Sequence, residues 1–113
     1  MTSYESGLFG EFMAKKYLRF HGFRIVYSRY VTGRNTGRAE IDIIARRKNL
    51  MIFVEVKRRQ NVESAWAAIT PAQAVRLRRA AENFIAKNGW MGDTRFDAIL
   101  VCGIRIYWAR GAL

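Results

Sequence analysis

Three carboxylates and one lysine interrupt two strongly apolar segments of this sequence. Glu40 and Asp42 lie in an isoleucine-rich segment, and Glu55 and Lys57 lie in the valine-rich segment that follows it. Residues two apart on a β-strand point to the same face of a sheet. If both segments are strands, each pair of charged residues therefore shares one face.

A tight turn at residues 48–49 would join the two segments, 40–46 and 50–57, as a hairpin. In that register Asp42 lies opposite Glu55, and Glu40 lies opposite Lys57. Directly opposed side chains lie roughly 4.5–5.5 Å apart at Cβ, close enough for two carboxylates to hold one cation. A slip of one residue would send one set of charges to the other face.

Facing carboxylates repel each other, which makes them a poor choice for stability alone. Mg²⁺ removes that repulsion, since it binds one or two carboxylates together with waters and phosphate oxygens. We therefore expect Mg²⁺ (or Mn²⁺) at Asp42 and Glu55, where it would acidify a water and polarise a phosphate. Lys57 would orient the attacking water or stabilise the charge that develops on the phosphorane.

The alternative is an ordinary Glu40–Lys57 ion pair, with Asp42 and Glu55 on a solvated face of the sheet. Any one of these charges taken alone fits that alternative better. The whole set, at this spacing and in a chain of this charge, favours the metal site.

The length and composition predict one compact domain over residues 1–113. Twenty Lys and Arg against nine Asp and Glu give a net charge of +11. Such an excess favours phosphate backbones as partners, although an acidic membrane surface or a ribosome would also attract it. The single cysteine excludes an intrachain disulfide and a cysteine-based zinc site, and the single histidine excludes a histidine cluster or a serine triad.

Neither a secretory signal nor an apolar run long enough for a membrane span is present in the sequence. We therefore expect a cytoplasmic protein without a membrane partner.

The elements that must position these residues follow from hydrophobic periodicity and from helix start and stop signals. The predicted order is α-β-β-β-α-β-β, an α/β protein with a central mixed sheet flanked by helices. The predicted helices span 6–21 and 70–87, a short helical turn lies within 61–69, and the strands span 23–30, 40–46, 50–57, 95–102 and 104–109. On the first strand, Phe23, Ile25 and Tyr27 should share a face. Residues 31–38 should form a basic loop.

Several motifs in this order resemble the YraN-like family of small PD-(D/E)XK (restriction-endonuclease-like) proteins, which are similar to archaeal Holliday-junction resolvases. The motifs are Gly10-Glu11, Glu40-Ile41-Asp42-Ile43-Ile44, Phe53-Val54-Glu55-Val56-Lys57 and Arg95-Phe96-Asp97. The resemblance runs from about residue 7 to residue 101 and implies a restriction-endonuclease-like fold. It also implies that Asp42 and Glu55 bind metal, that Lys57 is catalytic, and that Glu11 leans from the first helix toward the site.

Three departures from the family pattern bear on the substrate. Ala39 stands where the family usually has glycine, Gln73 stands near where it usually has lysine, and the loop over residues 31–38 is longer than usual. Gln73 remains an acceptable polar residue at such a site. The residues that we expect to hold the nucleic-acid backbone are Arg34, Arg38, Arg58, Arg59 and Gln73.

The sequence therefore predicts a metal-dependent endonuclease that acts on DNA, plausibly on branched DNA. One rival is a nucleic-acid-binding module without catalysis, and another is an adaptor whose basic surface binds a protein or a ribosome. Since resolvases cut two strands symmetrically, a C2 homodimer is a natural expectation, although the sequence reveals no interface.

Overall fold

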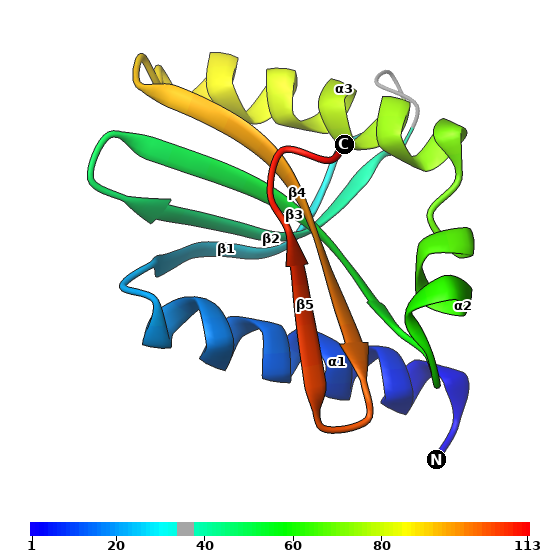
Figure 1. Cartoon of the computed structure of the whole chain (residues 1–113). Coiled ribbons are helices and arrows are strands. Elements are labelled where there is room, and N and C mark those ends of the chain that lie inside the picture. The colour runs from blue at the N-terminus through cyan, green and yellow to red at the C-terminus, as the bar shows by residue number, and fades with distance from the viewer. Residues whose placement is uncertain (34–37) are drawn as a thin grey trace.

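A computed structural model describes residues 1–33 and 38–113, which form a mixed sheet with helices on both faces (Figure 1). The strands are β1 (Arg24–Val31), β2 (Glu40–Arg47), β3 (Leu50–Arg58), β4 (Asp93–Cys102) and β5 (Arg105–Ala109). They lie side by side in sequence order, with β3 and β4 parallel and the other neighbours antiparallel. The helices are α1 (Ser3–Phe20), α2 (Val62–Ala67) and α3 (Pro71–Asn88).

The predicted α/β class is confirmed, and the element order differs only in that the short helical turn expected within 61–69 is the separate helix α2. Helix α1 covers one face of the sheet, and α3 and α2 cover the other (Figure 1). The core accordingly has two main layers. Ala14 and Leu18 of α1 pack with Ile52 and Val54 on one side. On the other side, buried residues of α3 pack around Phe53.

Helix α3 begins and ends where the sequence predicts. The Thr70 side chain accepts a hydrogen bond from the backbone N–H of Gln73, and the Gln73 side chain accepts one from the backbone N–H of Thr70, each over 3.1 Å. Pro71 occupies the first turn, where its missing N–H costs nothing. Gly89, in the left-handed conformation at φ 61°, ends the helix. This reciprocal cap fixes the end of α3 that faces the site described below.

Helix α1 crosses β3 at Gly10, where it packs closely against side-chain atoms of the strand. A Cβ atom at position 10 would lie 3.1 Å from Cβ of Arg58 and 3.7 Å from a methyl carbon of Val56. Only glycine allows this approach without displacing β3. The next residue, Glu11, is thereby held beside the strand that carries Glu55.

The first strand differs from the prediction in one respect. A register shift between Ile25 and Tyr27 interrupts its pairing with β2, and such bulges turn the following side chains to the opposite face. Phe23 and Ile25 pack on the α1 side as expected. The prediction is wrong for Tyr27, whose ring centroid lies 5.3 Å from that of Tyr30, a residue that packs on the α3 side.

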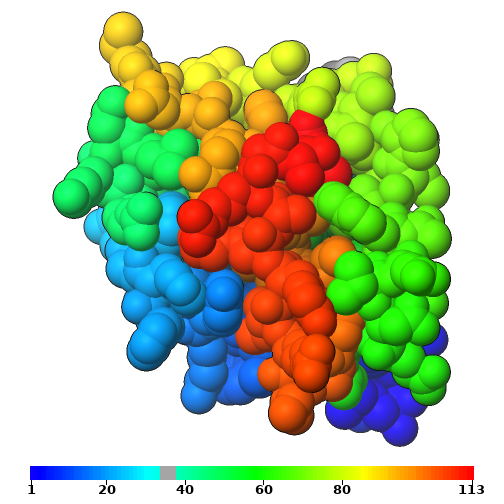
Figure 2. Space-filling view, viewed as in Figure 1, coloured from blue at the N-terminus to red at the C-terminus, as the bar shows by residue number. Residues whose placement is uncertain are grey.

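The C-terminal residues fold back over the sheet, as the red segment of Figure 2 shows. The backbone N–H of Leu113 donates to the carbonyl of Phe96 over 3.2 Å, and Arg78 of α3 donates to the Leu113 carbonyl. No helix in the described part of the chain is long and apolar enough to cross a bilayer.

Candidate active site

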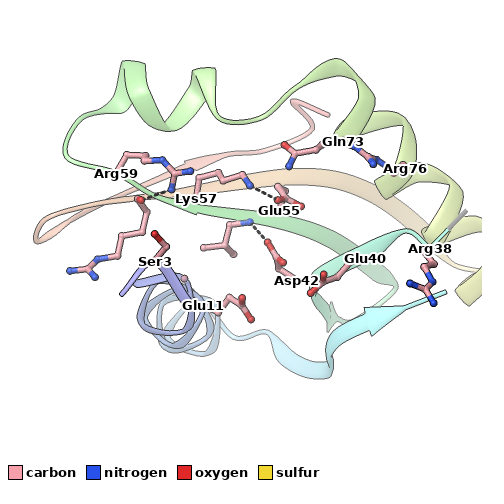
Figure 3. Close-up of a pocket in the computed structure, with 13 residues that line it drawn as sticks. Ser3, Glu11, Arg38, Glu40, Asp42, Glu55, Lys57, Arg59, Gln73 and Arg76 are labelled. Atoms are coloured by element: carbon pink, nitrogen blue, oxygen red, sulfur yellow. Dashed lines mark hydrogen bonds and ion pairs between the residues drawn. The ribbon is translucent and has the colours of Figure 1, made fainter. Parts of the chain in front are cut away.

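A cavity of about 450 Å³ opens between α1, the start of β2, the end of β3 and the first turns of α3 (Figure 3). Of the nine acidic residues in the chain, all of which the structure describes, four line this cavity: Glu11, Glu40, Asp42 and Glu55. They come from α1, β2 and β3. The cationic residues that line it are Arg38, Lys57, Arg58, Arg59 and Arg76.

Asp42 lies where β2 separates from β3. The predicted register holds along the hairpin as far as the pair Ile43 and Val54, beyond which no further ladder pair joins the two described strands. Oδ2 of Asp42 instead accepts a hydrogen bond of 2.8 Å from the backbone N–H of Val56. One carboxylate oxygen thus accepts the hydrogen bond that a backbone carbonyl of β2 would accept in a continued ladder. This bond orients the carboxylate, and the side chain lines the cavity.

Glu55 lines the same cavity from β3, so the two carboxylates do not point away from each other across the sheet (Figure 3). We call Asp42 and Glu55 the acidic pair. Lys57 extends beside it, with Nζ 3.3 Å from Oε1 of Glu55. Both of these side chains are largely covered, at 17% exposure for Lys57 and 12% for Glu55.

The predicted opposition of Glu40 and Lys57 is wrong, and so is the alternative in which the two form an ion pair. In the described part of the chain Lys57 pairs with Glu55 on its own strand, and no ion pair joins it to Glu40. The physical reason is the separation of the strands, because positions 40 and 57 no longer oppose each other once the ladder ends at Ile43. Glu40 is therefore a further carboxylate on the cavity wall.

Burial and mutual repulsion shift the acidic pair toward the protonated form. Burial, followed by the charge of Glu55, raises the pKa of Asp42 from 3.8 to about 8, and the hydrogen bond from Val56 only partly opposes this. Burial also raises the pKa of Glu55, against the lowering effect of Lys57. Charges of Glu11 and Glu40 raise both values further. The cavity therefore favours protonation of the acidic pair or the presence of a positive charge beside it.

The acidic pair has the donor chemistry that a hard divalent cation requires. Among the residues that the structure describes, no group of three or more His, Cys, Asp or Glu side chains is arranged to hold an ion. The protein would therefore supply Asp42 and Glu55 and leave the other positions to water and phosphate oxygens. That division is typical of Mg²⁺ and less suited to Ca²⁺, which takes more protein ligands.

These shifts predict how the stability of the metal-free protein depends on pH. Between the ordinary pKa of 3.8 and the folded value of about 8, the folded state holds a proton on Asp42 that the unfolded state has lost. The free energy of unfolding should therefore fall as pH rises across this window. Thermal melting in EDTA from about pH 5 to about pH 8 measures the effect. Saturating Mg²⁺ should flatten it, and an unchanged slope with Mg²⁺ would contradict metal binding at this site.

Glu11 enters the cavity from α1 and is held there by Arg29 of β1. Nε of Arg29 donates to Oε1 of Glu11 over 3.0 Å, and Nη2 donates to Oε2 over 3.2 Å. Arg29 itself has a left-handed backbone at φ 55°, which is uncommon outside glycine. Arg29 could not be predicted from the sequence, because nothing in the pattern of a strand shows that one residue leaves its face to contact a helix.

The residues that we expect to bind the nucleic-acid backbone differ in their surroundings. Arg38, Arg58, Arg59 and Gln73 line the cavity, whereas Arg34 lies outside the residues that the structure describes.

Arg58 is the most constrained of these residues. Its guanidinium contacts α1 and the residues before it, donating to Sδ of Met1 at 2.9 Å and to Oγ of Ser6 at 3.2 Å. It also lies 4.5 Å from the ring centroid of Phe9. Arg59 is more exposed and donates to the backbone carbonyl of Arg58 over 2.8 Å. Arg58 thus packs α1 onto the end of β3, while Arg59 faces solvent.

The family motif residue Asp97 lies away from the cavity. Its carboxylate is fully buried and accepts hydrogen bonds from Nε and Nη2 of Arg95, Nε1 of Trp108 and the backbone N–H of Gly111. Asp97 therefore anchors Arg95 and joins β4 to the residues that follow β5. Ala39, at the usual glycine, is buried, and its N–H donates to Oγ1 of Thr32 over 2.8 Å.

The chain is thus an α/β protein whose mixed sheet presents two largely covered carboxylates and a lysine to one cavity. Comparison with known sequences then gives the family. The chain belongs to the Uncharacterised protein family UPF0102, whose model matches residues 10–101. The family membership predicted from the motifs is confirmed.

Curated relatives from several bacteria carry the same family name. A UPF0102 protein of Bradyrhizobium diazoefficiens is 39% identical over 103 residues, covering 89% of this chain and 74% of the relative. One from Paramagnetospirillum magneticum is 37% identical over 102 residues, covering 88% and 79%. One from Rhodopseudomonas palustris is 40% identical over 103 residues, covering 89% and 76%. Their names assign no activity.

Proposed function

We propose that this protein is a Mg²⁺-dependent endonuclease that hydrolyses phosphodiester bonds in DNA. One observation carries the proposal: Asp42, Glu55 and Lys57 line a single cavity in a protein whose net charge is +11. Four of the few carboxylates in a strongly basic chain gather where a polyanion would be bound. A surface that only attracted nucleic acid would gain nothing from acids at its centre.

Each residue has a role that its position permits. The acidic pair would hold the cation, which when bound polarises a phosphate and acidifies a water. Lys57, kept beside the pair by Glu55, would donate a hydrogen bond to the attacking water or to a phosphate oxygen. Glu11, fixed by Arg29, would add a negative charge next to the acidic pair. Arginines on the cavity rim would hold the neighbouring phosphates.

The proposal is tested by incubating purified protein with Mg²⁺ or Mn²⁺ and a panel of DNA junctions, flaps, single strands, duplexes and RNA. We expect metal-dependent cleavage of at least one DNA, lost in Asp42→Asn, Glu55→Gln and Lys57→Met. The matched control is Asp93→Asn, which removes an exposed carboxylate at the start of β4 and should leave cleavage unchanged.

No cleavage of any substrate, or equal cleavage by the Asp42 and Glu55 variants, would overturn the nuclease proposal. Salt-sensitive binding without cleavage would then favour the nucleic-acid-binding module. Protein partners that remain bound after nuclease treatment would favour the adaptor.

A further inference from the structure

Cationic residues lie at two ends of the cavity, with the acidic pair between them. In Figure 3, Arg59 lies at one end, beyond Lys57, whereas Arg38 and Arg76 lie toward the other end. Arg59 follows β3, Arg38 precedes β2, and Arg76 is on α3. Three separate segments therefore contribute arginines around one acidic centre.

Arg76 lines the cavity from α3, although it is not among the residues that the sequence predicts for the site. It is one helical turn beyond Gln73, which also lines the cavity, and residues three apart on a helix are neighbours. Its side chain is exposed, and no hydrogen bond or ion pair joins its guanidinium to another residue that the structure describes. It therefore has donors available for a ligand.

By contrast, Arg78 of the same helix is already engaged. It donates to the carbonyl of Leu113 and lies 5.8 Å from the ring centroid of Phe96. Arg79 is exposed like Arg76 but is not among the residues that line the cavity. The helix thus provides one arginine that faces the cavity and one of the same charge that does not.

We propose that the cavity binds a continuous polynucleotide strand that passes over the acidic pair, with Arg76 and Arg38 contacting phosphates on one side and Arg59 on the other. A phosphate at the acidic pair has negative neighbours in both directions along a strand. Cations at both ends neutralise both neighbours, which suits a site within a chain and not one at a chain end. This inference rests on the proposed function for its scissile phosphate, but its strand-binding part can be tested without cleavage.

The binding test compares Arg76→Gln with Arg79→Gln, both in an Asp42→Asn background that prevents the expected cleavage. Fluorescence anisotropy of a short fluorescein-labelled single-stranded DNA is measured over a series of NaCl concentrations. Losing one charged hydrogen-bonding contact should weaken binding roughly tenfold in Arg76→Gln. The slope of log K against log salt should also fall by about 0.7, the value for one phosphate contact on a single strand. Arg79→Gln should change neither quantity appreciably.

One further variant and one further measurement guard against indirect effects. Arg76→Lys keeps the charge and should retain most of the affinity, and the melting temperatures of all three variants should match that of the parent. Equal losses in Arg76→Gln and Arg79→Gln, or no binding of the single strand by the parent, would overturn the inference.

A cleavage arm, taken together with the anisotropy result, separates this inference from the proposed function. Wild-type protein with Mn²⁺ is given circular and linear forms of the same single-stranded DNA. Cutting of the circle supports a strand that continues on both sides, whereas trimming of only the linear form would overturn both this inference and the endonuclease proposal and would indicate an exonuclease. If neither form nor any other substrate is cut, the nuclease proposal fails, and the anisotropy result alone decides the path of the strand.

Discussion

Replacing Asp42 by asparagine is expected to abolish metal-dependent cleavage and, in the absence of metal, to make the protein more stable at pH 8. Cleavage should fall because a metal contributes several kcal/mol to the transition state, which corresponds to roughly 10²–10⁴ in rate. Stability should rise because asparagine keeps an oxygen for the N–H of Val56 and carries no charge. The buried, repelled carboxylate that raises the pKa of Asp42 to about 8 is then gone.

The two effects are measured by initial rates in Mg²⁺ or Mn²⁺ and by melting curves in EDTA. The melting temperature of wild type should exceed that of the variant only when saturating metal is added, since binding to the folded state stabilises it. Glu55→Gln should act in the same direction on both measurements. A variant that melts lower than wild type at pH 8 without metal would show that Asp42 is a structural residue and would weaken the assignment of the metal.

Replacing Asp97 by alanine is expected to cause the largest loss of stability in the molecule, with no direct effect on the cavity. The carboxylate is fully buried and accepts four hydrogen bonds, which join β4 to Trp108 of β5 and to Gly111. Removing one member of a buried ion pair typically costs about 3–5 kcal/mol because its partner is left uncompensated. Urea unfolding in EDTA should therefore show a midpoint well below that of wild type.

The matched control is again Asp93→Asn, an exposed acid on the same strand, for which a change within about 0.5 kcal/mol is expected. Asp97→Asn should lie between the two, because an amide oxygen can still accept from Trp108 or Gly111 but cannot pair with the charge of Arg95. An alanine variant as stable as the control would mean that these hydrogen bonds contribute little beyond what water supplies in the unfolded chain.

The sequence was sufficient to predict those parts of the site that depend on neighbouring residues along a strand. Asp42, Glu55 and Lys57 share a cavity because period-two alternation and the length of the turn fix the hairpin register, which holds as far as Ile43 and Val54. Local signals also placed the start of α3 at Thr70, since its reciprocal cap lies within four residues.

The parts that failed depend on packing between elements distant in sequence. The hairpin ladder ends at Ile43 and Val54, and beyond it the carboxylate of Asp42 accepts from the N–H of Val56. Lys57 there pairs with Glu55 and not with Glu40. Arg29 reaches Glu11 only because α1 packs beside β1. No periodicity within one segment carries that information.

The gathering of four acids inside a basic rim also has a consequence for how a polyanion would approach the cavity. The arginines at the rim would attract a strand from a distance, whereas the carboxylates at the centre would repel it. Monovalent salt would weaken the outer attraction by screening, whereas a divalent ion at the acidic pair would link the carboxylates to a phosphate. Tight binding of the strand would therefore require the divalent ion as well.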